Sequence, residues 1–301
     1  MMTKEQVEKY VFPNYGLGHI VSIEQIETSG NLIFEIETKE EKYILRFNPP
    51  KGPQARSSEE VQEEVLFLQY LFENDFPVGE IVKTSDGQSV VEVEGVFGYL
   101  RTFVKGESFD DPKDEEIYRV GTLLGRLHNL SKDYRPTYKR VHKWNPGRVK
   151  QYWPENKEII LNSGFEFAHD FVRLFSEQLQ RLSFKPGLAS GMIHEDLGIR
   201  HVLWKEGEIS GVIDFDRMYV GLFIMDIGQA IRGWCAGEHE VATFLEGYEE
   251  NRMLSDNEKD ALGDAIAFAF LERAQAFVLR GIAEEDEEMI GLGLDELESI
   301  L

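Results

Sequence analysis

The spacing of apolar residues changes along the chain, and the first hundred residues have the pattern of antiparallel strands. Short runs rich in Val, Ile, Leu and Phe are separated by turns that contain Gly, Asn and charged residues. The predicted strands are 21–26, 32–36, 43–47, 89–93 and 97–104, and the predicted turns are 28–31, 38–41 and 94–95. Runs of this kind predict β-hairpins.

A helix is predicted to begin at Ser57 and Ser58, because apolar residues recur at helical spacing from there to Leu71 and can bury one face. Beyond Gly106 the pattern becomes mainly helical. The predicted helical stretches are 117–127, 156–182 and about 225 to the end, and brief strand signals occur at 191–193, 201–204 and 209–215.

These patterns together predict an α+β protein with two lobes. A small antiparallel β-rich lobe with one main helix occupies residues 1–103, and a larger, mainly α-helical lobe occupies residues 104–301. The chain contains no internal repeat and no low-complexity linker between the two.

Composition limits the partners that this chain can have. It contains 32 Lys and Arg against 55 Asp and Glu, a net charge of −23. Binding to nucleic acid or to an anionic membrane needs clustered basic residues, so we expect neither partner. Apolar residues make up 42% and aromatic residues 12% of the chain, which is the composition of a packed core rather than of a disordered chain.

Targeting and cysteine content indicate the cytoplasm. The chain contains no run of 18 apolar residues, which is the length needed to cross a membrane. Its first residues are charged and lack the apolar core of a signal peptide. The single cysteine, Cys235, excludes an intramolecular disulfide and a cysteine-based zinc site, and it fits a reducing compartment.

Residues that could act in catalysis or bind a metal are concentrated in the segment 191–226. Two short apolar runs there each end in acidic residues, and a hairpin with its turn at 205–208 lies between them. The first run leads into His194, Glu195 and Asp196, and the second leads into Asp214, Phe215 and Asp216. We expect the hairpin to bring Asp196, His201 and Asp214 towards one place.

Phosphoryl transfer needs a grouping of this kind. One carboxylate orients the attacking hydroxyl and takes its proton, while another holds the magnesium ions that neutralise the phosphates. Taken singly, an aspartate at a strand end is also a common turn former. The joint pattern is more specific: His-x-Asp, a polar ligand five residues later, and an apolar strand that ends in Asp.

The segment resembles the catalytic core of the aminoglycoside phosphotransferase-like kinases, a family that includes macrolide, homoserine and choline kinases. The resemblance implies a bilobal fold shared with protein kinases. It also implies that Asp196 is the catalytic base, that His194 braces the catalytic loop, and that Asp214 is the main ligand of Mg²⁺. His128 and Asp226 match structural positions, with Asp226 anchoring the catalytic loop through its backbone.

Two positions depart from the family pattern. His201 stands where Asn is usual, and imidazole is a softer ligand than an amide oxygen for Mg²⁺. His201 could bind the metal directly, contact metal-bound water, or only hold the loop. Glu195 stands where Gly is typical, and would either favour a cationic acceptor or face solvent. Glu195 and Asp216 are the candidate acceptor contacts.

The resemblance extends to nucleotide binding in the first lobe. Arg46 stands in place of the phosphate-pairing Lys, and Glu64 matches the glutamate that pairs with it; the alternative is an edge-strand Arg that faces water. Ser29, Gly30 and Asn31 match the phosphate-covering loop. Thr102, Phe103 and Val104 match the hinge, whose backbone would bind the base, so the sequence does not separate ATP from GTP.

The predicted function is therefore Mg²⁺-dependent transfer of the γ-phosphoryl group of ATP or GTP to a hydroxyl of a small, cationic molecule. Aminoglycoside or macrolide antibiotics are the first candidate acceptors, which would make the protein a resistance enzyme, and homoserine- or choline-like metabolites are the alternative. A protein kinase and a nucleotide-binding pseudokinase are the competing functions. Only eleven residues separate Asp214 from Asp226, which is short for a peptide-docking loop. We expect a monomer or a dimer.

One basic stretch stands out from the acidic chain. Residues 131–153 hold seven Lys and Arg against one Asp. They would either bind an anionic group of the acceptor or pair with acidic helices elsewhere.

Overall fold

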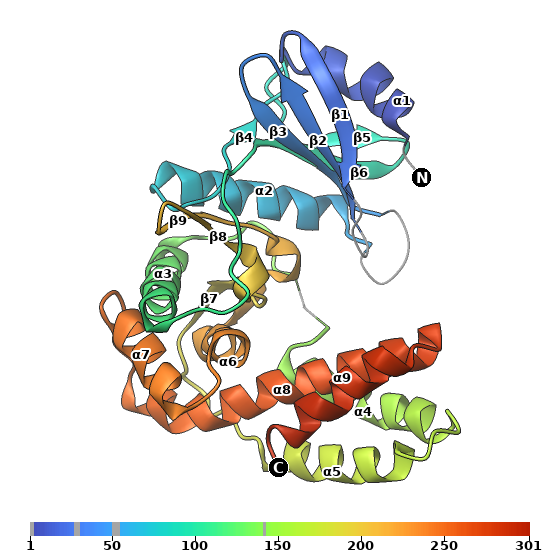
Figure 1. Cartoon of the computed structure of the whole chain (residues 1–301), viewed down its shortest axis with the longest axis vertical. Helices are drawn as coiled ribbons and strands as arrows, with labels where there is room; N and C mark the ends of the chain where they lie inside the picture. Colours follow the sequence, from blue (N-terminus) through green and yellow to red (C-terminus); the bar gives the residue numbers. More distant parts are fainter. Residues whose placement is uncertain (1–2, 27–30, 50–54, 141–142) are drawn as a thin grey trace. The chain divides into compact units, whose positions relative to one another are not determined.

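The computed structural model of the chain describes residues 3–26, 31–49, 55–140 and 143–301. Its internal contacts divide it into two compact units (Figure 1). Unit 1 comprises Met1–Phe109, Tyr134–Lys139 and Arg200–Asp216, and unit 2 comprises Asp110–Asp133, Arg140–Ile199 and Arg217–Leu301. The expected lobes, cut once at 103/104, differ from these units mainly in the assignment of 134–139 and 200–216.

Unit 1 is built on an antiparallel sheet with the strand order β1-β2-β3-β6-β4, and β5 also pairs with β6. The strands are β1 (Ile20–Ile26), β2 (Leu32–Thr38), β3 (Lys42–Phe47), β4 (Ile81–Val82), β5 (Val91–Val93) and β6 (Val96–Thr102). The hairpin patterns therefore predicted the sheet correctly. The two-residue strand β4 was missed because it is too short to show a period.

The side chains of β3 alternate between the two faces of this sheet, so one face is apolar and the other carries Arg46. Leu45 and Phe47 are fully buried in an apolar core, which also contains Val7 and Val11 from the N-terminal helical turns. Those turns are α1 (Lys4–Gln6), η1 (Val7–Val11) and η2 (Phe12–Asn14). Since successive side chains point to opposite faces of a strand, Arg46 faces the other way, towards α2 (Ser58–Glu73).

Helix α2 begins where the sequence predicted. Ser57 is its N-cap and forms a capping box with Glu60, so two backbone N–H groups of the first turn are satisfied. Val61, Val65 and Leu71 are fully buried along one face. The cap fixes the first turn of the helix that carries Glu64.

The hairpin of β8 (Val202–Lys205) and β9 (Glu208–Val212) belongs to unit 1. Its turn residues Glu206 and Gly207 have φ of 55° and 82°, the left-handed pair that a tight two-residue hairpin turn requires. The backbone N–H of Val212 donates to the carbonyl of Pro77 at 2.7 Å, which ties the hairpin to the rest of the unit.

Unit 2 consists mainly of helices around the short pair of strands β7 (Ser190–Ile193) and β10 (Tyr219–Leu222) (Figure 1). The helices are α3 (Asp114–Asp133), α4 (Pro146–Leu161), α5 (Ala168–Arg181), α6 (Phe223–Trp234), α7 (Glu238–Glu249), α8 (Asp256–Glu284) and α9 (Glu287–Glu298). Helix α3 packs on α7, and α8 packs on both α6 and α9.

The single helical stretch expected over 156–182 is wrong. It contains two helices, α4 and α5, because the chain leaves the helical conformation after Leu161. Asn162 caps α4, and Gly164 then adopts φ of 82°, a left-handed conformation that glycine takes without steric cost. The apolar period continues across the turn, which is why the pattern alone did not show the break.

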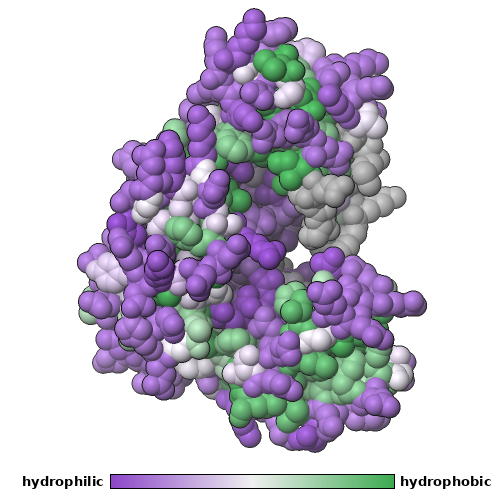
Figure 2. Space-filling model, in the orientation of Figure 1, coloured by the Kyte–Doolittle hydropathy of each residue, from purple (hydrophilic) through white to green (hydrophobic). Residues whose placement is uncertain are grey.

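The surface agrees with the composition. Figure 2 shows hydrophilic residues over most of the visible face, and the chain carries 55 acidic residues. In the part of the chain that the structure describes, no helix is both long and apolar enough to span a membrane.

Gly247 lies at the contact of α3 and α7, where the absence of a side chain allows the two helices to approach closely. A Cβ on Gly247 would lie 2.0 Å from the Tyr118 carbonyl oxygen, a backbone atom that cannot swing aside. We expect Gly247→Ala to lower the free energy of unfolding by about 1–3 kcal/mol in urea titrations, the usual cost of overpacking. Gly263→Ala in α8 is the control, because nothing lies within 4 Å of its Cβ. The control should gain about 0.5–1 kcal/mol from helix propensity, and an equal gain at Gly247 would contradict the prediction.

Candidate active site

Arg46 on β3 is the centre of a buried group of charges in unit 1, which we call the Arg46 cluster: Arg46, Arg56, Glu64, Tyr99 and Asp216. Arg46 Nη1 lies 3.0 Å from Glu64 Oε1, so the ion pair expected between these residues is present. Arg46 also contacts Asp216, and Arg56 contacts the second oxygen of Glu64. The Tyr99 hydroxyl donates to Glu64 Oε1 at 2.7 Å. The reading of Arg46 as a water-facing edge residue is wrong, because its side chain is 6% exposed on an inner strand.

The electrostatics of this cluster fix its charge state. Burial alone raises the pKa of Glu64, but the charges of Arg46 and Arg56 outweigh it and lower the pKa to about 2. Burial likewise lowers the pKa of Arg46, but Glu64, Tyr99 and Asp214 together raise it by more, so the net shift is upward. Burial and the neighbouring Glu64 raise the pKa of Tyr99. Arg46 and Glu64 are therefore charged at neutral pH, and Tyr99 is a neutral donor.

Asp216 lies in this cluster rather than at a free surface. Its carboxylate contacts Arg46, lies 3.7 Å from Arg56 Nη1, and accepts a hydrogen bond from the Asn31 side-chain amide. Of the predicted phosphate-covering loop, Ser29 and Gly30 lie outside the described residues. Asp216 was expected to contact the phosphoryl acceptor. It instead bonds Arg46 and Asn31, the two side chains that were expected to hold phosphates.

The predicted hinge runs along β6 and beyond it. The backbone N–H of Thr102 donates to the Glu80 carbonyl and that of Phe103 donates to the Lys42 carbonyl, both at 2.9 Å. Two of the three backbone N–H groups that were predicted to be available to the base are therefore already hydrogen-bonded within unit 1. A nucleotide base would have to use the backbone N–H of Val104 or the carbonyls of this segment.

His201 and Asp214 lie together at the open end of the β8–β9 hairpin. The Ile213 N–H donates to the His201 carbonyl at 3.0 Å, and His201 Nε2 lies 3.4 Å from Asp214 Oδ2. Asp214 has φ of 65° and a side chain that is 42% exposed. A left-handed non-glycine residue at a strand end is uncommon, and such residues cluster at functional sites. Two of the three groups that the hairpin was expected to gather are therefore adjacent, and the third, Asp196, belongs to unit 2.

The loop that follows β7 in unit 2 is anchored by the buried carboxylate of Asp226, near the start of α6. The backbone N–H groups of His194 and Glu195 each donate to Asp226 at 2.8 Å, as expected for this position. The N–H of Asp196 donates to His194 Nδ1 at 3.2 Å, and Trp234 Nε1 donates to the Leu197 carbonyl at 2.8 Å. These bonds fix the backbone on both sides of the Asp196 carboxylate.

A second row of buried groups holds Asp226 in turn. His128 Nε2 lies 3.1 Å from Asp226, and His128 Nδ1 lies 2.7 Å from the Tyr248 hydroxyl, which accepts from Arg252 at 2.8 Å. Burial lowers the pKa of His128 despite the bond to Asp226. We therefore assign the neutral tautomer, with Nε2–H donating to Asp226 and Nδ1 accepting from Tyr248. His128 is a structural residue here, as the sequence predicted.

Glu195 corrects an expectation. Its side chain is 0% exposed, so the alternative in which it faces solvent is wrong. With its N–H tied to Asp226 and φ of 64°, the residue turns inward. Both carboxylate oxygens are buried without a hydrogen-bond partner among the described residues, and burial raises the pKa well above its usual value. Glu195 is therefore driven towards its neutral form.

Arginines from α8 and η4 (Phe215–Arg217) contribute to unit 2 in a way that the sequence reasoning missed. Arg273 contacts the Asp196 carboxylate, and Arg217 Nη2 lies 2.8 Å from Glu272. A signal was present in the sequence: Glu272 and Arg273 are the only charged residues in the apolar run 265–279. Charged residues are almost never buried unless they are paired, so such a pair predicts buried ionic contacts. Arg56, the missed member of the Arg46 cluster, carries no comparable signal.

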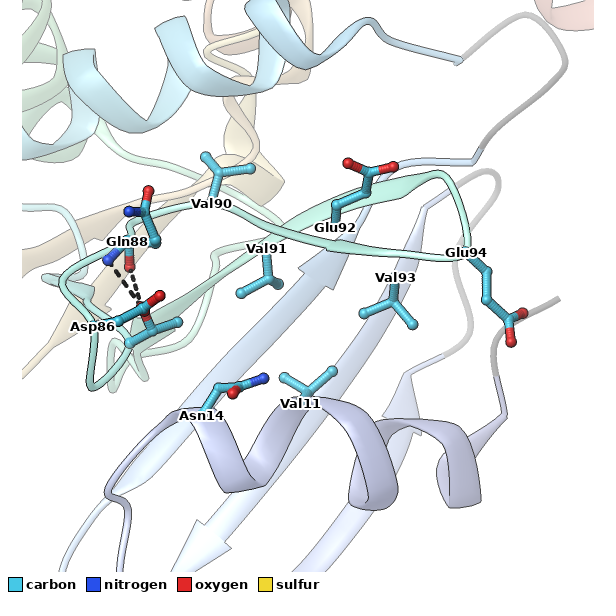
Figure 3. Close-up of a pocket in the computed structure, with 10 residues that line it drawn as sticks. Val11, Asn14, Asp86, Gln88, Val90, Val91, Glu92, Val93 and Glu94 are labelled. Atoms are coloured by element: carbon cyan, nitrogen blue, oxygen red, sulfur yellow. Dashed lines mark hydrogen bonds between the residues drawn. The ribbon is translucent and has the colours of Figure 1, made fainter.

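A pocket beside β5 is separate from these groups. In Figure 3, Val91 and Val93 point towards Val11 of the N-terminal helical turns, while Glu92 points away. A second pocket is lined by residues that include Ser58 and Tyr138. Among the described residues that line the two pockets there is no Lys or Arg and no member of the Arg46 cluster. Neither is a candidate for binding phosphates.

Comparison with known sequences gives one family over most of the chain. The model described as "Phosphotransferase enzyme family" matches residues 22–262. A homoserine kinase of Methylobacillus glycogenes is 24% identical over 270 residues, which are 85% of this chain and 79% of that protein. A homoserine kinase of Neisseria meningitidis serogroup B is 27% identical over 259 residues, 81% of this chain and 79% of its own length.

Comparison with solved structures gives the same fold. An amicoumacin kinase in complex with AMP-PNP, Ca²⁺ and amicoumacin matches with a TM-score of 0.74 at 19% identity, over 99% of this chain and 94% of that one. A microcompartment-associated aminopropanol kinase matches at 0.70 and 17% identity, over 97% and 95% of the two chains. A spectinomycin phosphotransferase with ADP and spectinomycin matches at 0.68 and 13% identity, over 100% and 99%. The predicted α+β, bilobal kinase-like fold is confirmed.

Proposed function

The chain belongs to the phosphotransferase enzyme family, and on this premise we propose how its residues divide the reaction. The enzyme class expected from the sequence, a small-molecule kinase that phosphorylates an alcohol group, is confirmed by this membership. One observation carries the assignment of the site. The backbone around Asp196 is held by two hydrogen bonds to the buried Asp226, which keeps a partly exposed carboxylate in a fixed position.

Unit 1 supplies the nucleotide-binding groups in this proposal. Arg46 binds phosphate oxygens of ATP or GTP, with its position set by Glu64 and Tyr99. Ser29, Gly30 and Asn31 cover the phosphates, and the segment 102–104 binds the base through its backbone. Because Asp216 already contacts Arg46, the phosphates compete with this carboxylate for the same guanidinium.

Asp214 fits the role of the Mg²⁺ ligand. Mg²⁺ is usually held by one or two carboxylates together with substrate phosphates and water, and Asp214 offers an exposed hard oxygen ligand at a strand end. Among the described residues no group of three or more His, Cys, Asp or Glu is arranged to hold a metal, so phosphate and water oxygens would complete the coordination. His201, 3.4 Å from Asp214, orients that carboxylate or contacts metal-bound water. When bound, Mg²⁺ neutralises the charge that develops on the phosphates.

The transfer itself requires little from the protein beyond position and charge. The acceptor hydroxyl forms a bond to the γ-phosphorus while the bond between that phosphorus and the β–γ bridging oxygen breaks. Asp196 orients the hydroxyl and takes its proton, and the products are a phosphate monoester and the nucleoside diphosphate. His194 braces the loop by accepting the Asp196 N–H, and Arg46 stabilises the phosphate charge.

In this proposal the acceptor is a small hydroxylated molecule, and the enzyme acts in the cytoplasm. The relatives named above act on homoserine, aminopropanol, amicoumacin and spectinomycin, so both metabolites and antibiotics are candidates, and a resistance function is one of them. A coupled assay of ADP or GDP release over homoserine, aminopropanol, choline, aminoglycosides and macrolides tests the proposal with both nucleotides. Mg²⁺-dependent release with one acceptor class supports it. Nucleotide binding without release over the whole panel would indicate a pseudokinase.

Asp214 gives a specific prediction within this function. We expect Asp214→Asn to lower kcat by about 10²-fold or more, because it removes the main carboxylate for the metal that stabilises transition-state charge. Raising the Mg²⁺ concentration should recover part of the loss, which a purely structural defect would not show. Asp86→Asn, in a turn of unit 1, is a control that should keep wild-type kcat. A variant of Asp214 with unchanged kcat and unchanged Mg²⁺ dependence would exclude this residue as the ligand.

A further inference from the structure

One arginine of unit 2 contacts the Asp196 carboxylate and two more lie within its electrostatic influence, although the chain as a whole carries a charge of −23. Arg273 contacts Asp196 directly, Arg217 lies 2.8 Å from Glu272, and Arg232 lies 2.6 Å from Glu296. They come from α8, η4 and α6, so three separate elements deliver guanidinium groups to one region. Glu272 links two of them, with Arg273 Nε 3.8 Å from one of its oxygens.

In the described part of the chain, two arginines of this cluster keep N–H donors that make no hydrogen bond. The Nε atoms of Arg217 and Arg273 are buried without a hydrogen-bond partner among the described residues. The two side chains are still 15% and 16% exposed, and Asp196 is 19% exposed. A guanidinium offers five N–H donors in a planar fork, and this fork matches a carboxylate in a bidentate geometry. Arg217 can therefore keep its bond to Glu272, while Arg273 can exchange its contact with Asp196 for another carboxylate.

The side chain in contact with the Asp196 carboxylate is a cation. A cationic group of an acceptor at Asp196 would meet the like charge of Arg273. Of the two acidic side chains that the sequence offered as acceptor contacts, Glu195 is fully buried and Asp216 contacts Arg46 in unit 1. Burial, followed by the charge of Arg217, lowers the pKa of Lys143, so the basic stretch 131–153 brings a further amine near Arg217.

We propose that the acceptor carries a carboxylate, bound by Arg273 with Arg217 beside it, and that this ion pair places the hydroxyl against Asp196. The inference rests on the proposed function, because it takes Asp196 as the base, and it names the acceptor class as hydroxylated carboxylic acids. Binding the acceptor carboxylate draws Arg273 away from Asp196, which frees the carboxylate of the base for the hydroxyl. Amino alcohols without a carboxylate and the polycationic antibiotics lack the group that makes this exchange.

Matched acceptors that differ in one group give the test. L-Homoserine and 3-amino-1-propanol differ only in the carboxylate, as do L-threonine and 1-amino-2-propanol, and 4-hydroxybutyrate retains the carboxylate without the amine. In the wild type, we expect the carboxylate to raise kcat/KM by about 10- to 100-fold within each pair, the usual effect of a charge-assisted hydrogen bond. Most of the difference should lie in KM, because the carboxylate is bound before and during transfer.

The variants compare two arginines of the same helix. Arg273→Gln should bring the two members of each pair to similar kcat/KM, and Arg273→Lys should keep part of the preference as a single charge without the fork. Arg280→Gln is the matched control, because Arg280 is half-exposed on α8 and pairs only locally with Glu284. The ratio within a pair does not depend on the fraction of active enzyme, so partial unfolding of a variant does not affect the result.

The outcomes separate the inference from the function on which it rests. Equal or better use of the carboxylate-free acceptors, kanamycin included, would overturn the inference and leave phosphotransfer intact. Retention of the full carboxylate preference in Arg273→Gln would also overturn it. Failure of every acceptor to release ADP or GDP, together with no Mg²⁺-dependent nucleotide binding, would overturn the proposed function and the inference together.

Discussion

Replacing Asp196 by asparagine is expected to lower kcat by about 10²- to 10⁴-fold, the range that a positioned general base contributes. The substitution keeps the size and shape of the side chain but removes its ability to take the proton of the hydroxyl. The backbone bonds of the loop run through His194, Glu195 and Asp226 and do not involve the Asp196 carboxylate. The loop should therefore keep its conformation while turnover is lost.

Nucleotide binding is the measurement that distinguishes this loss from misfolding. The groups assigned to the nucleotide lie in unit 1, so titration calorimetry with ATP or GTP and Mg²⁺ should give a dissociation constant within about twofold of the wild type, since no direct contact is removed. Asp170→Asn, on the exposed surface of α5, is the control and should retain full kcat. A turnover close to that of the wild type in Asp196→Asn would remove Asp196 from the role of base.

The elements that the sequence predicted well are those with a local cause. The runs in β1, β2 and β3, the cap of α2 at Ser57 and the turn of the β8–β9 hairpin all follow from neighbouring residues. The break between α4 and α5 was missed because a single left-handed glycine ends a helix without changing the apolar period. Local patterns thus specify the type of an element better than its length.

The site residues divide in a similar way. His194, Asp196 and Asp214 were predicted as site residues because their spacing along the chain is itself the signal. The partners of these groups are remote: Arg273 contacts Asp196 across 77 residues of sequence. The inward turn of Glu195 depends on its bond to Asp226, 31 residues away. No periodicity carries that information, so the expected solvent exposure of Glu195 could be corrected only by the fold.

The contact of Arg273 with Asp196 also changes the meaning of the net charge. A net charge of −23 fits the cationic acceptor that the sequence predicted, because an acidic surface steers cations. Charges in close contact with a bound acceptor affect it more than distant surface charges do. Exposed charges more than about 10 Å apart are largely screened at 0.1 M salt, whereas buried pairs are not. In the proposed acceptor site, we therefore expect Arg217, Arg232 and Arg273 to weigh more in acceptor choice than the acidity of the whole surface.

The Arg46 cluster gives the largest expected effect on stability. Glu64 is fully buried between Arg46 and Arg56, and Glu64→Gln leaves Asp216 as the remaining carboxylate of the Arg46 cluster for two buried arginines. Breaking a buried ion pair from one side costs about 3–5 kcal/mol, because the remaining charge is no longer compensated. Urea titration at pH 7 should show this loss in the free energy of unfolding. Glu73→Gln, exposed on the same helix, should change it by less than about 0.5 kcal/mol.

The pH dependence of the same comparison tests its cause. The pKa of Glu64 is about 2 in the folded protein, below its ordinary value of 4.5 in the unfolded chain. A carboxylate with a depressed folded pKa contributes stability that is fully present above the unfolded pKa and is lost as the pH falls towards the folded one. The difference in unfolding free energy between wild type and Glu64→Gln should therefore be constant above pH 5 and should shrink as the pH falls from about 4.5 towards 2. A difference that stays constant down to pH 3 would mean that packing, rather than the charge of Glu64, holds Arg46 in place.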